Sequence, residues 1–242
     1  MEYEFAIIYW GLPRSIKKTH KSHKKYVFDV LNKYNLNYKI FMHSWKTKDD
    51  NQYVWENIIP QKIDYEEYKL LNPDLYILDD QNEFLESVNM DNYFYKNGWE
   101  KNGHSKKGEW LPQLIKNHVC ALESQKRGFD MVKESVLKGD KFKFIIFIRP
   151  DITLHNKLPI KKIIPNYKKI QIPNHSHGEG LNDQFAITNY ENGNLYSNRI
   201  NELADFRINN GRIVSEKYCK FIISKYNMKI NMLDLKYSIT RP

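Results

Sequence analysis

The chain has 242 residues, of which 41% are hydrophobic and 28% are charged. The apolar content is too high for a disordered chain, and the charge content is too high for a membrane protein. A chain of this length can bury a full hydrophobic core without disulfides or a structural metal. Its two cysteines, Cys120 and Cys219, lack the spacing of a zinc ribbon or a disulfide framework. We therefore expect both to be reduced, buried core residues.

The charge of the chain is strongly positive, with a formal net charge of +9 at pH 7 and a pI near 9.2. Most basic residues are lysines, and a chain so rich in Lys, Asn, Ile and Tyr is typical of an A/T-rich genome. If genome composition explains the lysines, they are solvated surface residues. The alternative is a positive field that attracts phosphates. The densest cluster is formed by Lys17, Lys18, Lys21, Lys24 and Lys25.

The first apolar run, Glu4–Trp10, is too short to span a membrane and has no basic segment before it. No other apolar window reaches the length of a membrane span. We therefore expect neither a signal peptide nor a membrane anchor, and a cytoplasmic protein that is not secreted.

The predicted elements begin with a βαβ unit. The apolar run Glu4–Trp10 predicts a buried strand that ends at Gly11, and the spacing of apolar residues over Lys17–Asn32 predicts a helix. A second strand is expected over Tyr38–His43. Such a unit favours a parallel strand pair with a right-handed crossover.

The middle of the chain, residues 46–107, is polar and aromatic with weak periodicity, which indicates loops and short elements. A helix is predicted over Leu114–Val136, and Gly128 is expected to end or bend it. The run Lys141–Ile148 is the strongest strand signal in the chain. That strand must end at Pro150, which has no N–H to donate.

The last third predicts short strands over Ile170–Pro173 and Phe185–Thr188, a helix capped by Ser215 and ending near Lys225, and a strand over Ile230–Leu235. We find no internal repeat and no linker. The prediction is therefore a single α/β domain over residues 1–242, with a mostly parallel central sheet flanked by helices.

Polar loops follow the predicted strands, and ligands of open α/β sheets bind at the carboxyl ends of the strands. In the first loop, Gly11 permits close backbone approach and Arg14 can hold a phosphate bidentately. The loop matches neither GxGxxG nor GxxxxGK[ST], which argues against a dinucleotide-binding fold and a P-loop NTPase. A structural salt bridge of Arg14 is the alternative.

The other two loops carry carboxylates. Asp151 directly follows the most hydrophobic strand, where one carboxylate and substrate phosphates can hold a hard cation, and a plain turn is the alternative. The loop before Phe185 combines His175, His177, Glu179 and Asp183. The alternative there is an exposed, flexible loop, and the two histidines alone are too few for a zinc site.

Three segments in the same order resemble a known family: IIYWGLPRSIKKTHKSHKKYVFDVLNKYNLNYKIFMHSW, FKFIIFIRPDI and NDQFAIT. They resemble GT-A-like nucleotide-diphospho-sugar glycosyltransferases of giant viruses and bacterial polysaccharide clusters, over roughly residues 4–225. The resemblance implies a GT-A-like, Rossmann-like domain and, for a viral protein, a location in the host cytoplasm. It also implies a nucleotide-sugar donor, a glycan or protein acceptor, and no nucleic-acid partner.

The resemblance also implies roles for individual residues. Gly11 and Arg14 fall on the donor site, and Tyr9 or Trp45 could stack on the base or the sugar. Arg149-Pro150-Asp151 would occupy the position of a DxD metal motif, with Mn²⁺ or Mg²⁺ on Asp151 and with His177 completing the metal shell.

This sequence departs from the DxD pattern, because Arg149 replaces the first aspartate and can itself neutralise the donor diphosphate. The resemblance implies that Asp183 is the catalytic base. The adjacent pair Asp79-Asp80 is more typical of a helix N-terminus or a surface turn.

Two further function classes remain open. The positive charge and the 14% aromatic content suggest a nucleic-acid-binding protein, although no recognisable module interleaves basic and aromatic residues. Another nucleotide-dependent transferase, such as a nucleotidyltransferase, would use a similar sheet.

Overall fold

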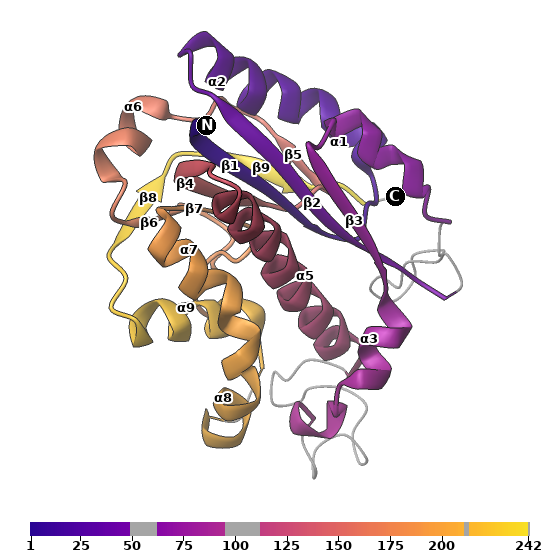
Figure 1. Ribbon diagram of the computed structural model, residues 1–242. Coiled ribbons are helices and arrows are strands. Elements are labelled where there is room, and N and C mark those ends of the chain that lie inside the picture. Colours follow the sequence, from indigo (N-terminus) through magenta and orange to yellow (C-terminus); the bar gives the residue numbers. More distant parts are fainter. Residues whose placement is uncertain (49–61, 95–111, 211–212, 242) are drawn as a thin grey trace.

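A seven-stranded sheet forms the centre of the protein (Figure 1). The computed structural model describes residues 1–48, 62–94, 112–210 and 213–241. The strand order is β3-β2-β1-β4-β7-β6-β8. The bounds of these strands are β1 Glu2–Gly11, β2 Tyr38–Lys46, β3 Leu75–Asp80, β4 Lys141–Ile148, β6 Ile170–Pro173, β7 Phe185–Thr188 and β8 Ile230–Leu233.

Six of the seven strands run in the same direction, and β7 is antiparallel to its neighbours β4 and β6. Strands β1 and β2 pair in parallel, as the predicted βαβ unit requires. The structure thus confirms an α/β fold with a mostly parallel central sheet flanked by helices.

Helices cover both faces of the sheet (Figure 1). The α-helices of the described residues are α1 Ile16–His23, α2 Asp29–Lys33, α3 Gln81–Ser87, α5 Pro112–Leu137, α6 Ile160–Ile163, α7 Tyr190–Ser197, α8 Leu203–Asn210 and α9 Ser215–Lys225. A π-helical turn, Lys24–Phe28, joins α1 to α2, and short 3₁₀ helices lie at Tyr65–Leu71, Met90–Asn92, Ile164–Asn166 and Asn198–Glu202.

The alternation of side chains along β1 explains why this strand is apolar throughout. Phe5, Ile7 and Tyr9 belong to the core cluster that packs against α1 and α2. Ala6 and Ile8 belong to the cluster on the opposite face, which α5 covers. A central strand buried on both faces has no polar side, so its sequence is a continuous apolar run.

A second, two-stranded sheet brings the end of the chain back to the central sheet. Strand β5 (Ile152–Leu154) pairs antiparallel with β9 (Tyr237–Ile239). The chain then passes α1, where Lys18 Nζ donates to the carbonyl of Arg241 at 3.3 Å, and Figure 1 shows the C-terminus beside this helix. The last residues thereby reach the carboxyl ends of the central strands.

Some elements differ from the prediction. Strand β3 and helix α3 are short elements in the stretch predicted as loops and short elements, although neither was predicted individually, and part of that stretch (residues 49–61 and 95–111) is outside the described residues. Helix α5 continues through Gly128, where a Cβ would lie 2.6 Å from Cγ2 of Ile8, so this glycine lets the helix approach β1 closely. Val214, not Ser215, is the N-cap residue of α9.

Two other expectations, on the cysteines and on Asp80, are confirmed. Cys120 and Cys219 are free and buried. Asp80 is the N-cap of α3, because its carboxylate accepts hydrogen bonds from the backbone N–H groups of Asn82 and Glu83. None of the described helices combines the length and the apolar character that crossing a membrane requires.

Candidate active site

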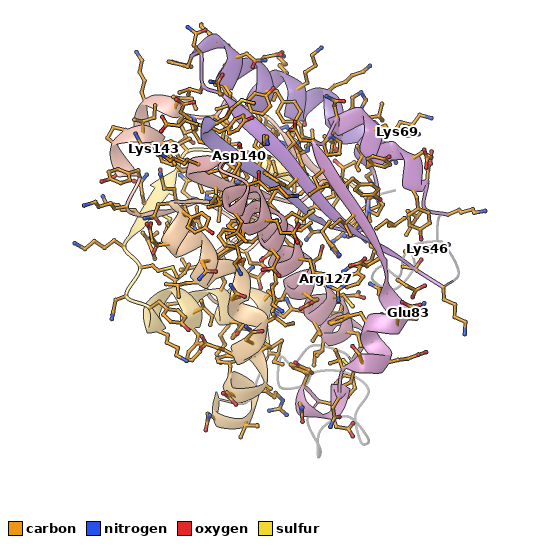
Figure 2. All side chains as sticks on the ribbon, viewed as in Figure 1. Lys46, Lys69, Glu83, Arg127, Asp140 and Lys143 are labelled. Atoms are coloured by element: carbon orange, nitrogen blue, oxygen red, sulfur yellow. The ribbon has the colours of Figure 1, made fainter. Side chains whose placement is uncertain are left out.

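A cavity of about 300 Å³ opens at the carboxyl ends of β1 and β4. Chain order reverses between these two adjacent strands, which makes this the switch point where ligands of open α/β sheets bind. In Figure 2, Lys46, the last residue of β2, lies at the carboxyl ends of the strands. Asp140, which directly precedes β4, lies at their amino ends. The charged side chains lining the cavity are Arg14, Arg149, Asp151, Asp183, Glu216 and Arg241.

Two arginines from different loops converge on the carboxylate of Asp151. Arg149 donates from Nε to Oδ1 at 2.9 Å and from Nη2 to Oδ2 at 2.6 Å. Arg14 donates from Nε and Nη2 to Oδ2 at 3.1 and 3.0 Å. Burial acts to raise the pKa of Asp151, but the charges of Arg149 and Arg14 outweigh it and hold that pKa well below its usual range.

Arg241 adds a third guanidinium to this group from the chain end beyond β9. Its burial and the nearby charge of Arg14 lower the pKa of Arg241, while Asp151 acts in the opposite sense. Arg149 also lies over the ring of Trp10, with 5.9 Å between its guanidinium carbon and the ring centroid. Positive charge is therefore concentrated around one carboxylate. We call Arg14, Arg149 and Arg241 the arginine cluster.

The turn after β1 has a fixed backbone. Gly11 has φ +96°, a conformation that favours glycine, and a Cβ at this position would meet no atom within 4 Å. Its N–H donates to Oγ of Ser124 on α5 at 2.8 Å. Thr19 on α1 donates to the carbonyl of Pro150 at 2.7 Å, so α1 also ties the two strand-end loops together.

Ser124 belongs to a polar network that also contains His43 and Asp79. Its Oγ lies 2.8 Å from Nδ1 of His43, and His43 Nε2 lies 3.0 Å from Oδ2 of Asp79. Burial lowers the pKa of His43 to about 4, against the opposing effect of Asp79, so the ring is neutral at pH 7. Arg127 of α5 also binds Asp79. Because Ser124 and His43 are fully buried, this network holds the turn and does not face a substrate.

The loop before β7 is buried at its end, over residues 181–183, whereas Asn174, Ser176, Gly178 and Glu179 are exposed. The buried amide of Asn182 donates to the carbonyl of His175 at 2.9 Å and to the hydroxyl of Tyr237 at 2.6 Å. Its Oδ1 accepts the backbone N–H groups of Gln184 and Phe185 at 3.0 and 3.3 Å. These bonds fix the backbone on both sides of Asp183, which is 9% exposed and lines the cavity.

The glycines of this loop are needed for packing against α9. A Cβ on Gly180 would lie 2.0 Å from the carbonyl oxygen of Glu216, and one on Gly178 would lie 3.2 Å from Cδ of Glu216. The loop therefore rests on the first turn of α9.

Two carboxylates thus line the cavity from neighbouring elements, Asp183 from the loop and Glu216 from α9. Burial and the charge of Asp183 raise the pKa of Glu216, whose Oε2 accepts a hydrogen bond from Ser215 at 3.0 Å.

Of the predicted site residues, Tyr9 and His177 do not line the cavity, and Trp45 lines it with a buried ring. Tyr9 is fully buried on the α1 face of β1, with its hydroxyl 2.9 Å from Nδ1 of His23, and its neighbour Trp10 lines the cavity instead. Trp45 lines the cavity with 1% exposure, but its ring stacks on Phe84 at 5.0 Å. His177 is not among the lining residues, and its Nδ1 accepts the N–H of Asn182 at 3.2 Å.

The donor set around Asp151 does not fit a divalent cation. Both carboxylate oxygens already accept hydrogen bonds from guanidinium groups, and the side chain is 3% exposed. The described residues contain no group of three or more His, Cys, Asp or Glu side chains that could hold a metal ion. The binding of Mn²⁺ or Mg²⁺ to Asp151 and His177 remains an untested prediction.

The sequence points to Gly11, Arg14, Arg149, Asp151 and Asp183 as site residues, and all five line the cavity. It did not predict the contribution of Arg241, because no pattern near the chain end marks a return to the first strand. It did not predict Ser124, because a serine within a long helix carries no signal for a contact with a distant turn.

Comparison with known proteins gives little similarity. No protein-family model matches the chain, and no curated protein matches its sequence. Among solved structures, the fold is similar to the apo form of mouse xyloside xylosyltransferase 1, with a TM-score of 0.42 and 10% sequence identity. The match covers 96% of this chain and 85% of the other chain. A likeness at this level assigns neither a family nor an activity.

Proposed function

We propose that the chain is a glycosyltransferase that moves a sugar from a nucleotide-diphosphate donor to a hydroxyl group of a glycan or protein acceptor. The observation that supports this most directly is the cavity at the switch point, where the arginine cluster and Asp183 line the same space. An anion site beside a carboxylate base is what displacement of a nucleoside diphosphate requires. The GT-A-like sequence resemblance points to the same class.

In this proposal the arginine cluster binds the donor diphosphate. Guanidinium groups are planar, permanently charged and weakly hydrated, so they can hold phosphate oxygens bidentately. When the sugar–phosphate bond breaks, negative charge develops on the leaving diphosphate. Arg14 and Arg149, which Asp151 already orients, stabilise that charge without reorganisation.

Asp183 acts on the acceptor in the proposed reaction. Its carboxylate lines the cavity and accepts no hydrogen bond from another described residue, while the backbone around it is held by Asn182. A carboxylate in this position can take the proton of an incoming hydroxyl group. Glu216, beside it, is the residue that can share that proton or orient the acceptor.

Donor hydrolysis and transfer, measured over a panel of nucleotide sugars, test this function. Asp183→Asn keeps the size of the side chain and removes its basicity, so transfer should fall by about 10² or more, while nucleotide binding stays near that of the parent. Asp205→Asn, an exposed position on α8, is the matched control and should retain activity. If Asp183→Asn transfers sugar within a few-fold of the parent, Asp183 is not the base. If no nucleotide sugar is hydrolysed or transferred by the parent, the proposed function is wrong.

A further inference from the structure

Asp151 is occupied as a hydrogen-bond acceptor before any ligand binds. Oδ2 receives N–H groups from Arg14 Nε, Arg14 Nη2 and Arg149 Nη2, and Oδ1 receives one from Arg149 Nε. A carboxylate offers about four lone-pair sites, so these bonds use nearly all of its capacity. Its side chain is 3% exposed, which leaves no open side for another ligand.

A divalent cation at Asp151 would also meet strong repulsion. Such a cation binds carboxylate oxygens at about 2.0 to 2.1 Å, in the space where the arginine N–H groups already lie. Two guanidinium charges would then stand a few ångströms from a doubly charged ion, where Coulomb repulsion is large. Binding a metal would require Arg14 and Arg149 to leave a carboxylate that neutralises them.

The charge that a metal would supply is already present in the protein. The three members of the arginine cluster lie around the single carboxylate of Asp151, so positive charge exceeds negative charge locally, although over the whole cavity Asp183 and Glu216 bring the arginines and carboxylates to equal numbers. Asp183 and Glu216 also line the cavity, but in the described part of the chain neither accepts a hydrogen bond from an arginine. The locally positive part of the cavity, around Asp151, is the part suited to the negative charges of a diphosphate ester.

Resting on the proposed function, we infer that this site binds the donor diphosphate without a divalent cation, through Arg14, Arg149 and Arg241. Asp151 orients the two guanidinium groups and is not a metal ligand. Arg241 is the third arginine of the site and follows β9. The pairing of β9 with β5 therefore positions Arg241 for diphosphate binding.

The test is titration calorimetry of the full chain with UDP and GDP, each in EDTA and in MnCl₂. For the nucleotide that binds, the dissociation constants in the two conditions should agree within about two-fold. Arg241→Gln should weaken binding by at least about ten-fold in both conditions, the factor expected for one lost charge-assisted hydrogen bond. Lys21→Gln, which removes one positive charge from the exposed face of α1, is the control for the general field and should bind like the parent.

The outcomes separate this inference from the proposed function. Binding that is ten-fold or more tighter in MnCl₂ than in EDTA overturns the inference and leaves the glycosyltransferase proposal standing. Unchanged binding by Arg241→Gln, with circular dichroism showing a folded variant, also overturns it. Absence of UDP and GDP binding in both conditions overturns the inference, and absence of donor hydrolysis across the nucleotide-sugar panel overturns the proposed function.

Discussion

We expect the burial of His23 to lower the free energy of unfolding in acid. Its ring is fully buried between α1, β1 and β5, with Nε2 2.8 Å from the carbonyl oxygen of Ile152 and Nδ1 2.9 Å from the hydroxyl of Tyr9. Burial lowers the pKa of His23 to about 4, although the bond to Ile152 and the charge of Asp151 oppose that shift. The neutral ring therefore donates from Nε2 and accepts from Tyr9.

The direction and size of the effect follow from that pKa. The folded-state pKa of about 4 lies below the ordinary value of 6.5, so the unfolded chain binds more protons between these two values. Stability is fully present above about pH 6.5 and is lost as the pH falls toward 4. One pKa unit corresponds to about 1.4 kcal/mol, so His23 alone should remove on the order of 3 kcal/mol between pH 7 and pH 4.

Urea unfolding of the parent and of His23→Gln at pH 7, 6, 5 and 4 measures this loss. His43 and His118 are buried with lowered pKa values and act in the same sense, so only the difference between parent and variant reports His23. His23→Gln should be the less stable protein at pH 7, and the gap should narrow by on the order of 3 kcal/mol at pH 4. The partly buried His20, on the same helix, provides the control variant His20→Gln. A gap that is independent of pH would refute the reasoning.

Three further predictions concern the site. Arg14→Lys keeps the charge but cannot direct two N–H groups at one oxygen, so calorimetry should show nucleoside-diphosphate binding weakened by about 1 to 3 kcal/mol; equal affinity would mean that Arg14 is structural. Gly180→Ala should destabilise the fold by on the order of 3 kcal/mol in urea unfolding, because its Cβ would lie 2.0 Å from a backbone oxygen. Gly139→Ala, where a Cβ has open space but φ is +98°, should cost less, and equal losses would contradict the packing argument. The pKa of Glu216 is raised by burial and by the charge of Asp183, so the ionised form costs stability as the pH rises through that pKa. Glu216→Gln should therefore gain stability relative to the parent between pH 4 and pH 8, and a difference that does not change with pH would count against this.

The strands that the sequence predicts best are those whose own residues form a distinct apolar run. Strands β4, β6 and β7 have the predicted bounds, because each is a short apolar run closed by polar residues or proline. Strand β3 was missed because it lies at the edge of the sheet, is partly exposed and ends in two aspartates. Strands β5 and β9 have three residues each and are defined by pairing with each other, which no local pattern reports.

The cavity residues were predictable to the extent that they follow predicted strands. Arg14, Arg149 and Asp151 lie together because parallel strands bring their carboxyl ends to one edge. The choice between Tyr9 and Trp10 was not predictable in this way. A strand buried on both faces gives no polar residue from which to tell which side chains point toward α1 and which toward α5.

The loop before β7 shows why glycine content alone does not predict mobility. Glycine permits unusual backbone angles, and it also permits contacts that a Cβ would block. Only the position of α9 decides between these two uses, because Gly180 lies against the backbone of Glu216. Gly180, three residues before Asp183, is therefore held against α9.

The role of Asp151 likewise cannot be predicted from the residues next to it in the sequence. A carboxylate after a buried strand is compatible with a metal site or with a plain turn, and both interpretations treat it as a residue that acts alone. The structure adds Arg14 from a loop 137 residues away, which binds the same carboxylate as the neighbouring Arg149. Two guanidinium groups occupy its oxygens, so we infer that Asp151 orients two positive charges toward the cavity and does not bind a cation. The function of this acid is thus decided by the residues that reach it, and the sequence around Asp151 contains only one of them.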